Sequence, residues 1–117
     1  MKKSIVILSC CATLLLASCS TSTTSLYSWY NYENAAYEYQ KKNTDKSYAD
    51  ALNAYLKIID KQSGARKSVP PGLNAEYGYM LIKTGKVEEG LRYLKQEVAL
   101  YPESEVYISR IIKQLEE

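Results

Sequence analysis

Apolar residues recur at a helical spacing from Leu26 to the end of the chain, and this periodicity limits the possible folds more than any other feature. Five segments carry it, at residues 26–42, 46–62, 73–84, 87–101 and 102–117. A spacing of three or four residues gathers apolar side chains on one face of a helix. No segment has a convincing two-residue alternation of the kind that indicates a strand. We therefore expect an all-α fold with about five helices.

Helix-breaking residues separate these segments. Asn43-Thr44-Asp45 offers capping residues before the second helix. Pro70-Pro71-Gly72 precedes the third segment, and proline suits the first turn of a helix. Gly85 suits the position that follows the end of that helix, and Pro102 ends the fourth segment.

The spacing of residues 71–102 resembles a tetratricopeptide unit. Gly78 stands where the two helices of such a unit cross closely, and Leu81 where a large residue packs beside the crossing. Two positions depart from the pattern, because Asn74 replaces an aromatic residue or Leu and Glu97 replaces a small residue.

A fainter copy of the same pattern lies upstream. Residues 48–51 align with residues 87–90 at an offset of 39, which is the 34-residue period plus five residues in the loop 63–71. A single helical hairpin cannot bury both faces, so we expect two stacked hairpins with the last helix as a cap. A plain antiparallel bundle with coincidental spacing is the alternative.

The N-terminus has the features of an export signal. Met1-Lys2-Lys3 is positively charged, and residues 5–16 are mostly apolar but too short to span a bilayer. The sequence Leu16-Ala17-Ser18-Cys19 resembles the lipobox of bacterial lipoproteins. We therefore expect a signal peptide at 1–18, a lipidated Cys19 with a polar tether at 19–25, and a helical domain at 26–117. An ordinary secretory signal or an N-terminal anchor remains the alternative.

Lipidation implies a location and a membrane contact. Two or more acyl chains, palmitate among them, anchor a protein stably. Ser20 after the cysteine resembles the pattern that permits export to the outer membrane, facing the periplasm. Without Lys2 and Lys3, 13 basic and 13 acidic side chains remain, so there is no basic footprint for nucleic acid.

Three stretches in order, "LYSWYNYE", "VPPGLNAEYGYMLIKTGKVEEGLRYLKQEVALYPES" and "VYISRIIKQL", resemble a family of small Gram-negative outer-membrane lipoproteins with a domain of unknown function. Tyr30 stands where we expect Gly in the first stretch. The resemblance implies two neighbouring lipoprotein genes, one for a protein similar to the curli secretion-channel subunit and one for a surface-antigen-like protein. It therefore implies protein partners in an envelope assembly.

The sequence offers no set of catalytic residues. It contains no His, and the one cysteine that stays after cleavage is the expected lipidation site. No phosphate-binding loop or nucleophile elbow is visible. We expect a protein that is not an enzyme and that has no catalytic residue, metal or cofactor.

Twelve tyrosines and no phenylalanine are the most unusual feature of the composition. Each Tyr can fill a helix–helix seam with its hydroxyl at the edge, or it can form a binding surface. The repeat pattern predicts a concave partner-binding surface at Tyr79, Ile82 and Lys83, with Arg66 and Lys67 on its rim. An alternative aromatic surface for an envelope glycan or small ligand comprises Trp29, Tyr32 and Tyr39. We expect a protein-binding or assembly module, with glycan or small-ligand binding as the alternative.

Overall fold

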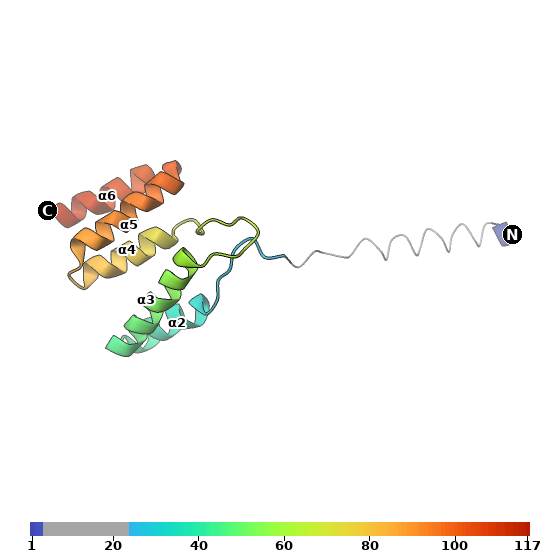
Figure 1. Ribbon diagram of the computed structural model, residues 1–117, viewed down its shortest axis with the longest axis horizontal. Coiled ribbons are helices and arrows are strands. Elements are labelled where there is room, and N and C mark those ends of the chain that lie inside the picture. The colour runs from blue at the N-terminus through green and yellow to red at the C-terminus, as the bar shows by residue number, and fades with distance from the viewer. Residues whose placement is uncertain (4–23) are drawn as a thin grey trace.

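The computed structural model describes residues 1–3 and 24–117 (Figure 1). Most of the expected signal peptide, the expected lipidation site Cys19 and tether residues 20–23 lie outside the described residues. Within the described part, no helix is both long and apolar enough to cross a membrane.

The domain consists of two antiparallel helical hairpins and a last helix (Figure 1). Helices α2 and α3 pair in the first hairpin, α4 and α5 pair in the second, and α6 packs on α5. Residues 24–117 contain no strand, so the predicted all-α class with five helices is confirmed. The elements are α2 (Tyr32–Lys42), α3 (Asp45–Asp60), α4 (Leu73–Lys83), α5 (Val87–Leu100), the short 3-10 helix η2 (Pro102–Ser104) and α6 (Glu105–Glu116).

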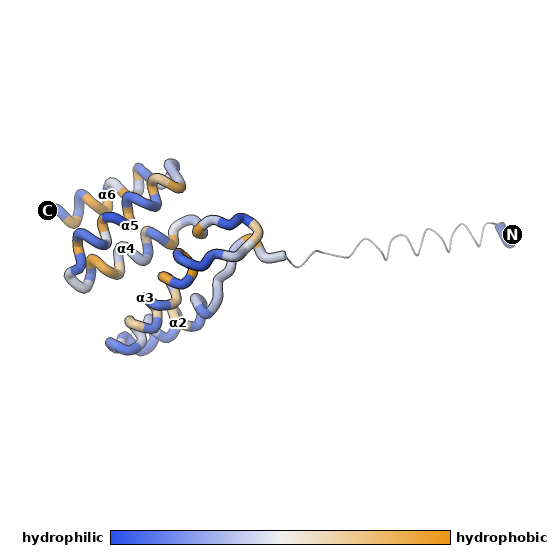
Figure 2. Tube along the Cα trace, in the orientation of Figure 1, coloured by the Kyte–Doolittle hydropathy of each residue, from blue (hydrophilic) through white to orange (hydrophobic). Residues whose placement is uncertain are grey.

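Two apolar clusters hold the helices together. The larger cluster joins the hairpins, with Tyr55 and Ile58 of α3 packed among Leu73, Tyr77 and Leu81 of α4. The smaller cluster joins Ile82, Leu94 and Ile108 from α4, α5 and α6. Figure 2 shows hydrophobic and hydrophilic residues alternating along the helices, as expected where each helix buries one face.

The first helix begins later than the sequence predicts, at Tyr32 instead of residue 26. Residues 25–28 pack along the loop between α3 and α4 instead. The backbone N–H of Ala65 donates to the carbonyl of Ser25 at 3.0 Å, and that of Arg66 donates to the carbonyl of Leu26 at 3.1 Å. A Cβ at Gly64 would lie 2.4 Å from the Leu26 carbonyl oxygen, so glycine permits this contact. The loop between α3 and α4 therefore holds the start of the domain.

The predicted helix ends are confirmed in two places. Thr44 caps α3, because its side chain accepts a hydrogen bond from the Ser47 N–H while the Ser47 hydroxyl accepts one from the Thr44 N–H. After α4, Gly85 has a φ of +91°. The N–H of Gly85 donates to Ile82 and that of Lys86 donates to Leu81, which is a Schellman ending.

Helix α4 begins at Leu73, where the sequence predicts, but no proline stands in its first turn. The two prolines lie before the helix, and Gly72 occupies the N-cap position with a φ of +90°. This left-handed backbone favours glycine. Gly72 turns the chain from the loop into α4 and directs its N–H toward α5, where it donates to Glu97.

Helices α4 and α5 cross at two glycines, as the sequence predicts for Gly78. A Cβ on Gly78 would lie 2.6 Å from the Gly90 carbonyl oxygen, and a Cβ on Gly90 would lie 2.4 Å from the Gly78 carbonyl oxygen. Leu81 and Leu94 pack beside the crossing and are almost completely buried. The two backbones are therefore too close for any side chain at either position.

Substitution of Gly78 by Ala should lower the melting temperature, because the new methyl group would push α4 away from α5. Overpacking of this kind costs about 1–3 kcal/mol, and each kcal/mol shifts the melting temperature of a small domain by roughly 4–8 °C. The Gly78→Leu variant should be less stable still. Asn53→Ala, on the exposed side of α3, is the matched control and should not lower the melting temperature, because Ala favours a helix more than Asn does. A melting curve unchanged by Gly78→Ala would contradict the close crossing.

Candidate functional site

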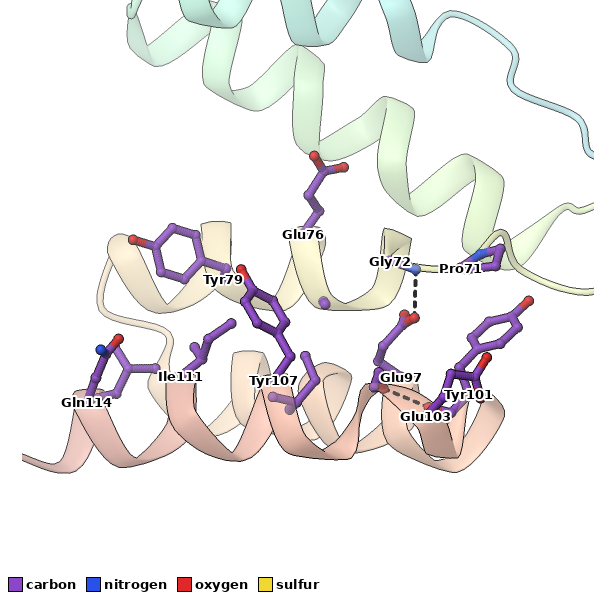
Figure 3. Close-up of a pocket in the computed structure, with 14 residues that line it drawn as sticks. Pro71, Gly72, Glu76, Tyr79, Glu97, Tyr101, Glu103, Tyr107, Ile111 and Gln114 are labelled. Atoms are coloured by element: carbon purple, nitrogen blue, oxygen red, sulfur yellow. Dashed lines mark hydrogen bonds between the residues drawn. The ribbon is translucent and has the colours of Figure 1, made fainter.

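A cavity with a volume of about 700 Å³ lies between α4 and α6 (Figure 3). We call it the α4–α6 groove. Its size lies in the range of ligand-binding pockets in proteins. The lining residues come from the turn before α4, from α4, from the end of α5, from η2 and from α6: Pro71, Gly72, Ala75, Glu76, Tyr79, Glu97, Tyr101, Glu103, Ser104, Tyr107, Ile108, Ile111, Gln114 and Leu115.

Two exposed tyrosines stand on opposite walls of this groove. Tyr79 on α4 is 46% exposed and Tyr107 on α6 is 67% exposed. Figure 3 shows Tyr107 and Ile111 rising from α6 toward α4. The groove therefore combines aromatic walls with an aliphatic α6 face, an arrangement that suits an apolar side chain of a ligand.

A buried carboxylate closes the end of the groove nearest Gly72. Glu97 is only 2% exposed, and its Oε1 atom accepts a hydrogen bond from the Gly72 N–H at 2.6 Å (Figure 3). Its Oε2 atom has no hydrogen-bond partner among the described residues. Both side-chain amide atoms of the fully buried Asn74 also lack a partner within residues 24–117. Asn74 and Glu97, the two residues that depart from the repeat pattern, are thus the buried residues of the described chain whose side-chain polar atoms lack hydrogen-bond partners.

The predicted partner-binding residues on α4 separate in the structure. Tyr79 lines the groove, and Lys83 lies beside it with its Nζ atom 5.8 Å from the centre of the Tyr79 ring. Ile82, by contrast, is only 8% exposed and packs against Leu94 and Ile108. The prediction that Ile82 faces the concave surface therefore needs correction. Ile82 lies one helical turn after Gly78, so it shares the face that crosses α5.

The predicted rim residues lie outside the groove. Arg66 and Lys67 are exposed and belong to the loop that packs along residues 25–28. Neither residue lines the α4–α6 groove. The structure thus joins this basic loop to the start of the domain instead.

The alternative aromatic surface is divided between two places. Trp29 is 42% exposed, and its ring centre lies 5.3 Å from that of Tyr32. Both residues line a small cavity of about 300 Å³ with Glu76. Tyr39 is separate, because its ring packs edge-on against Tyr48, 5.6 Å away. Only Trp29 and Tyr32 therefore remain together as an aromatic surface.

Tyr32 connects this smaller cavity to α4. Its hydroxyl donates to the Glu76 carboxylate at 2.8 Å, and its ring centre lies 5.0 Å from that of Tyr55. Burial, together with the hydrogen bond to Glu76, raises the pKa of the Tyr32 phenol above its ordinary value. The Glu76 side chain points away from α6 in Figure 3, so its carboxylate faces the first hairpin.

Other tyrosines belong to the core. Tyr55 and Tyr77 are 5% and 6% exposed, and the Tyr77 ring meets Tyr93 edge-on at 4.7 Å. Burial raises the pKa of Tyr55 to about 12, and the nearby charge of Glu76 adds to the effect. Burial, with a smaller contribution from Tyr93, raises the pKa of Tyr77 to about 12. Some tyrosines, such as Tyr55 and Tyr77, thus fill the core, while others, such as Tyr79, lie on an exposed surface.

The free energy of unfolding should fall as the pH rises from 10 to 12. Unfolded tyrosines lose their protons near pH 10, whereas Tyr55 and Tyr77 keep theirs to about pH 12 in the folded domain. The stabilisation is therefore complete below pH 10 and is lost as the pH passes through the folded pKa values. Urea unfolding at pH 9 and pH 11.5 measures the loss. Tyr55→Phe should reduce it, while Tyr37→Phe, at an exposed position, should not. Equal stability at both pH values would contradict the burial of these phenols.

Several groove residues were not identified as site residues from the sequence. The sequence pattern singles out neither Tyr101 nor Tyr107, and Ile111 belongs to the regular apolar stripe of the last helix. The one available signal was Glu97, a charged residue at a position where the repeat pattern has a small one. No cluster of three or more His, Cys, Asp or Glu side chains suited to a metal ion occurs in the described part of the chain.

These features define a class of protein: an all-α domain of stacked helical hairpins whose main cavity is an aromatic groove closed by a buried carboxylate. The sequence profile of the domain of unknown function DUF4810 matches residues 26–111. The chain therefore belongs to this family, and the match covers all five helices except the end of α6. Comparisons with curated proteins and with solved structures give no match.

Proposed function

We propose that this protein is a lipid-anchored, tetratricopeptide-like module that binds protein partners at the periplasmic face of the outer membrane. The observation that carries the proposal is the α4–α6 groove with its two exposed tyrosines. The proposed role is assembly, in which the groove receives a segment of a partner protein, and not catalysis.

The groove suits a protein ligand because of its side chains. Tyr79 and Tyr107 present large rings that lose little conformational entropy on binding. Such aromatic anchors carry much of the binding energy of protein interfaces. Ile111 on α6 adds an apolar surface to the same groove (Figure 3).

The expected anchor supports the choice of partners. Leu16-Ala17-Ser18-Cys19 resembles a lipobox, and the six residues from Ser20 to Ser25 reach only about 20 Å when fully stretched. The hydrogen bonds of Ser25 and Leu26 to the α3–α4 loop fix where the folded part begins. A domain held so close to the bilayer meets other lipoproteins of the same leaflet at a raised effective concentration. The proposed partners are such lipoproteins, and a secretion-channel-like subunit is among them.

Trp29 supports a second candidate function. Its ring is 42% exposed beside the small cavity that it shares with Tyr32. A half-exposed indole ring can stack on a sugar, so the alternative is an envelope-glycan or small-ligand binder. Retention of the purified protein on peptidoglycan, and its loss in Trp29→Ala, would favour this alternative over protein docking.

Replacement of Cys19 by Ser should remove the membrane anchor. The hydroxyl of Ser cannot form the thioether that carries the lipid, so the variant should be uncleaved or soluble and should not incorporate a labelled palmitate analogue. Globomycin, which inhibits the lipoprotein signal peptidase, should make the wild-type precursor accumulate. Cys11→Ser, within the expected signal, is the matched control and should leave labelling unchanged. Incorporation of label into Cys19→Ser would contradict the lipobox assignment.

Replacement of Tyr79 by Ala should abolish co-purification of partner proteins from the detergent-solubilised envelope. Loss of a central aromatic anchor costs about 2 kcal/mol or more, which is roughly a 30-fold loss of affinity. Helicity and membrane attachment should not change, because Tyr79 is half exposed and contributes little to the core.

Two variants serve as controls for this experiment. Tyr37 is 58% exposed on α2 and lies outside the groove, so Tyr37→Ala should retain the partners. Arg66→Ala should barely weaken the interaction, since Arg66 is an exposed charge remote from the aromatic anchors. Equal partner recovery with Tyr79→Ala and the wild type would place the binding surface elsewhere, and the aromatic surface of Trp29 and Tyr32 would be the next candidate.

A further inference from the structure

The α4–α6 groove has an unpaired carboxylate oxygen in its wall. Glu97 is 2% exposed, and only its Oε1 atom is hydrogen-bonded, to the Gly72 N–H at 2.6 Å. The Oε2 atom accepts no hydrogen bond from the part of the chain that the structure describes. A buried carboxylate is stabilised by a donor or a cation at each oxygen, so Glu97 has capacity for one more partner.

The charge of the groove points to a cation. Glu76, Glu97 and Glu103 are the charged residues among those that line it, and no Lys or Arg is present in that set. Glu76 already accepts the Tyr32 hydroxyl and points away from α6 (Figure 3). Glu97 and Glu103 therefore remain as carboxyl groups that form no ion pair within the described chain, at the end of the groove formed by α5 and η2.

The rest of the groove is mostly apolar and aromatic, so a bare cation would leave most of it uncovered. Tyr79, Tyr107 and Ile111 provide aromatic and aliphatic contact surface along α4 and α6. A Lys or Arg side chain combines a charged head with a long apolar stem, which matches a carboxylate beside apolar walls. The Tyr107 side chain is 67% exposed, so its ring is accessible to a ligand.

We propose that the α4–α6 groove binds a protein segment that carries a Lys or Arg side chain next to apolar side chains, with the cationic head beside the Glu97 carboxylate. Glu103 at the edge of the groove adds to the attraction, and Tyr79 and Tyr107 contact the apolar neighbours. This inference rests on the proposed function, because it names the chemistry of the partner segment that the groove accepts.

A pair of short peptides tests the charge requirement. The probes are acetyl-Leu-Arg-Leu-amide and acetyl-Leu-citrulline-Leu-amide, which have nearly the same shape but differ in charge. Titration of the full-length, ¹⁵N-labelled protein in detergent micelles gives the two dissociation constants from amide shifts. The Arg peptide should bind at least tenfold more tightly and should shift the Gly72 amide, whose N–H is bonded to Glu97. Equal binding of the two peptides would overturn the proposal.

The Glu97→Gln variant locates the effect. The Gln side chain keeps an oxygen that can accept the Gly72 N–H but loses the negative charge, so the preference for Arg over citrulline should disappear. If this variant does not fold, the exposed position Glu103 provides the test, because Glu103→Gln should weaken the Arg peptide about two- to threefold and leave the citrulline peptide unchanged. Glu33→Gln on α2 is the matched control and should alter neither constant. If the preference for Arg over citrulline survives Glu97→Gln, the proposed role of Glu97 is overturned. If Glu97→Gln cannot be measured and Glu103→Gln leaves the preference unchanged, the proposed role of these carboxylates is likewise overturned.

Photo-crosslinking separates this inference from the proposed function. The variant Tyr107→p-benzoylphenylalanine, in the anchored full-length protein, should crosslink a partner segment that has Lys or Arg within a few residues of Leu, Ile, Val or an aromatic residue. If the crosslinked segment contains no basic residue, and the crosslink disappears in the Tyr79→Ala variant, then the proposed protein docking is supported. Only the requirement for a cation is then overturned. Binding of N-acetyl-arginine amide as tightly as the Arg tripeptide would show that the apolar neighbours contribute nothing, and would also overturn the inference.

Discussion

The contact between Gly78 and Gly90 sets the distance between α4 and α5, and the C-terminal half of the domain depends on that distance. Each glycine lies where a Cβ would meet the other's carbonyl oxygen, at 2.6 Å from Gly78 and 2.4 Å from Gly90. Because the backbones touch, Ile82 can reach Leu94 and Ile108, and this small cluster holds α6 against the hairpin. The groove between α4 and α6 is therefore a consequence of how closely α4 approaches α5.

Two polar residues, Asn74 and Glu97, are buried in the interior of the domain, although packing alone does not require them there. Asn74 and Glu97 are buried at positions where the repeat pattern has an apolar or a small residue, and three of their side-chain polar atoms lack partners within the described chain. Each buried polar group left without a partner costs about 1–3 kcal/mol. Glu97 recovers part of this cost by accepting the N–H of Gly72, which directs the turn into α4. The partly unpaired Glu97 carboxyl in the groove wall thus lowers the free energy of unfolding, and such local costs are common at functional sites.

The limits of the sequence prediction are clearest at the first helix. Its apolar periodicity continues upstream to Leu26, yet α2 begins at Tyr32 because residues 25–28 form backbone hydrogen bonds with the α3–α4 loop. Tyr30 stands where the family resemblance leads us to expect Gly, and its φ of +49° is in the left-handed region that glycine favours. The Tyr30 hydroxyl donates a hydrogen bond to the carbonyl of Lys61, and the Lys57 Nζ atom lies 4.4 Å from the centre of the Tyr30 ring. These contacts with α3 and with the residue after it offset the backbone strain at Tyr30.

The sequence by itself determined the all-α class, the five helices, the caps at Thr44 and Gly85 and the close approach at Gly78. The helices and their caps depend on local geometry, in which residue type and spacing act within one or two turns. The close approach at Gly78 is a contact between two helices, and the sequence indicated it through the spacing of the repeat pattern. Only the tertiary structure decided that Tyr55 and Tyr77 lie in the core, that Tyr107 lines the same groove as Tyr79 and that Ile82 is buried. Periodicity identifies the residues that share a helix face, but it does not say which other helix covers that face. Contacts between residues far apart in the chain decide this, such as the hydrogen bond from the Gly72 N–H to Glu97.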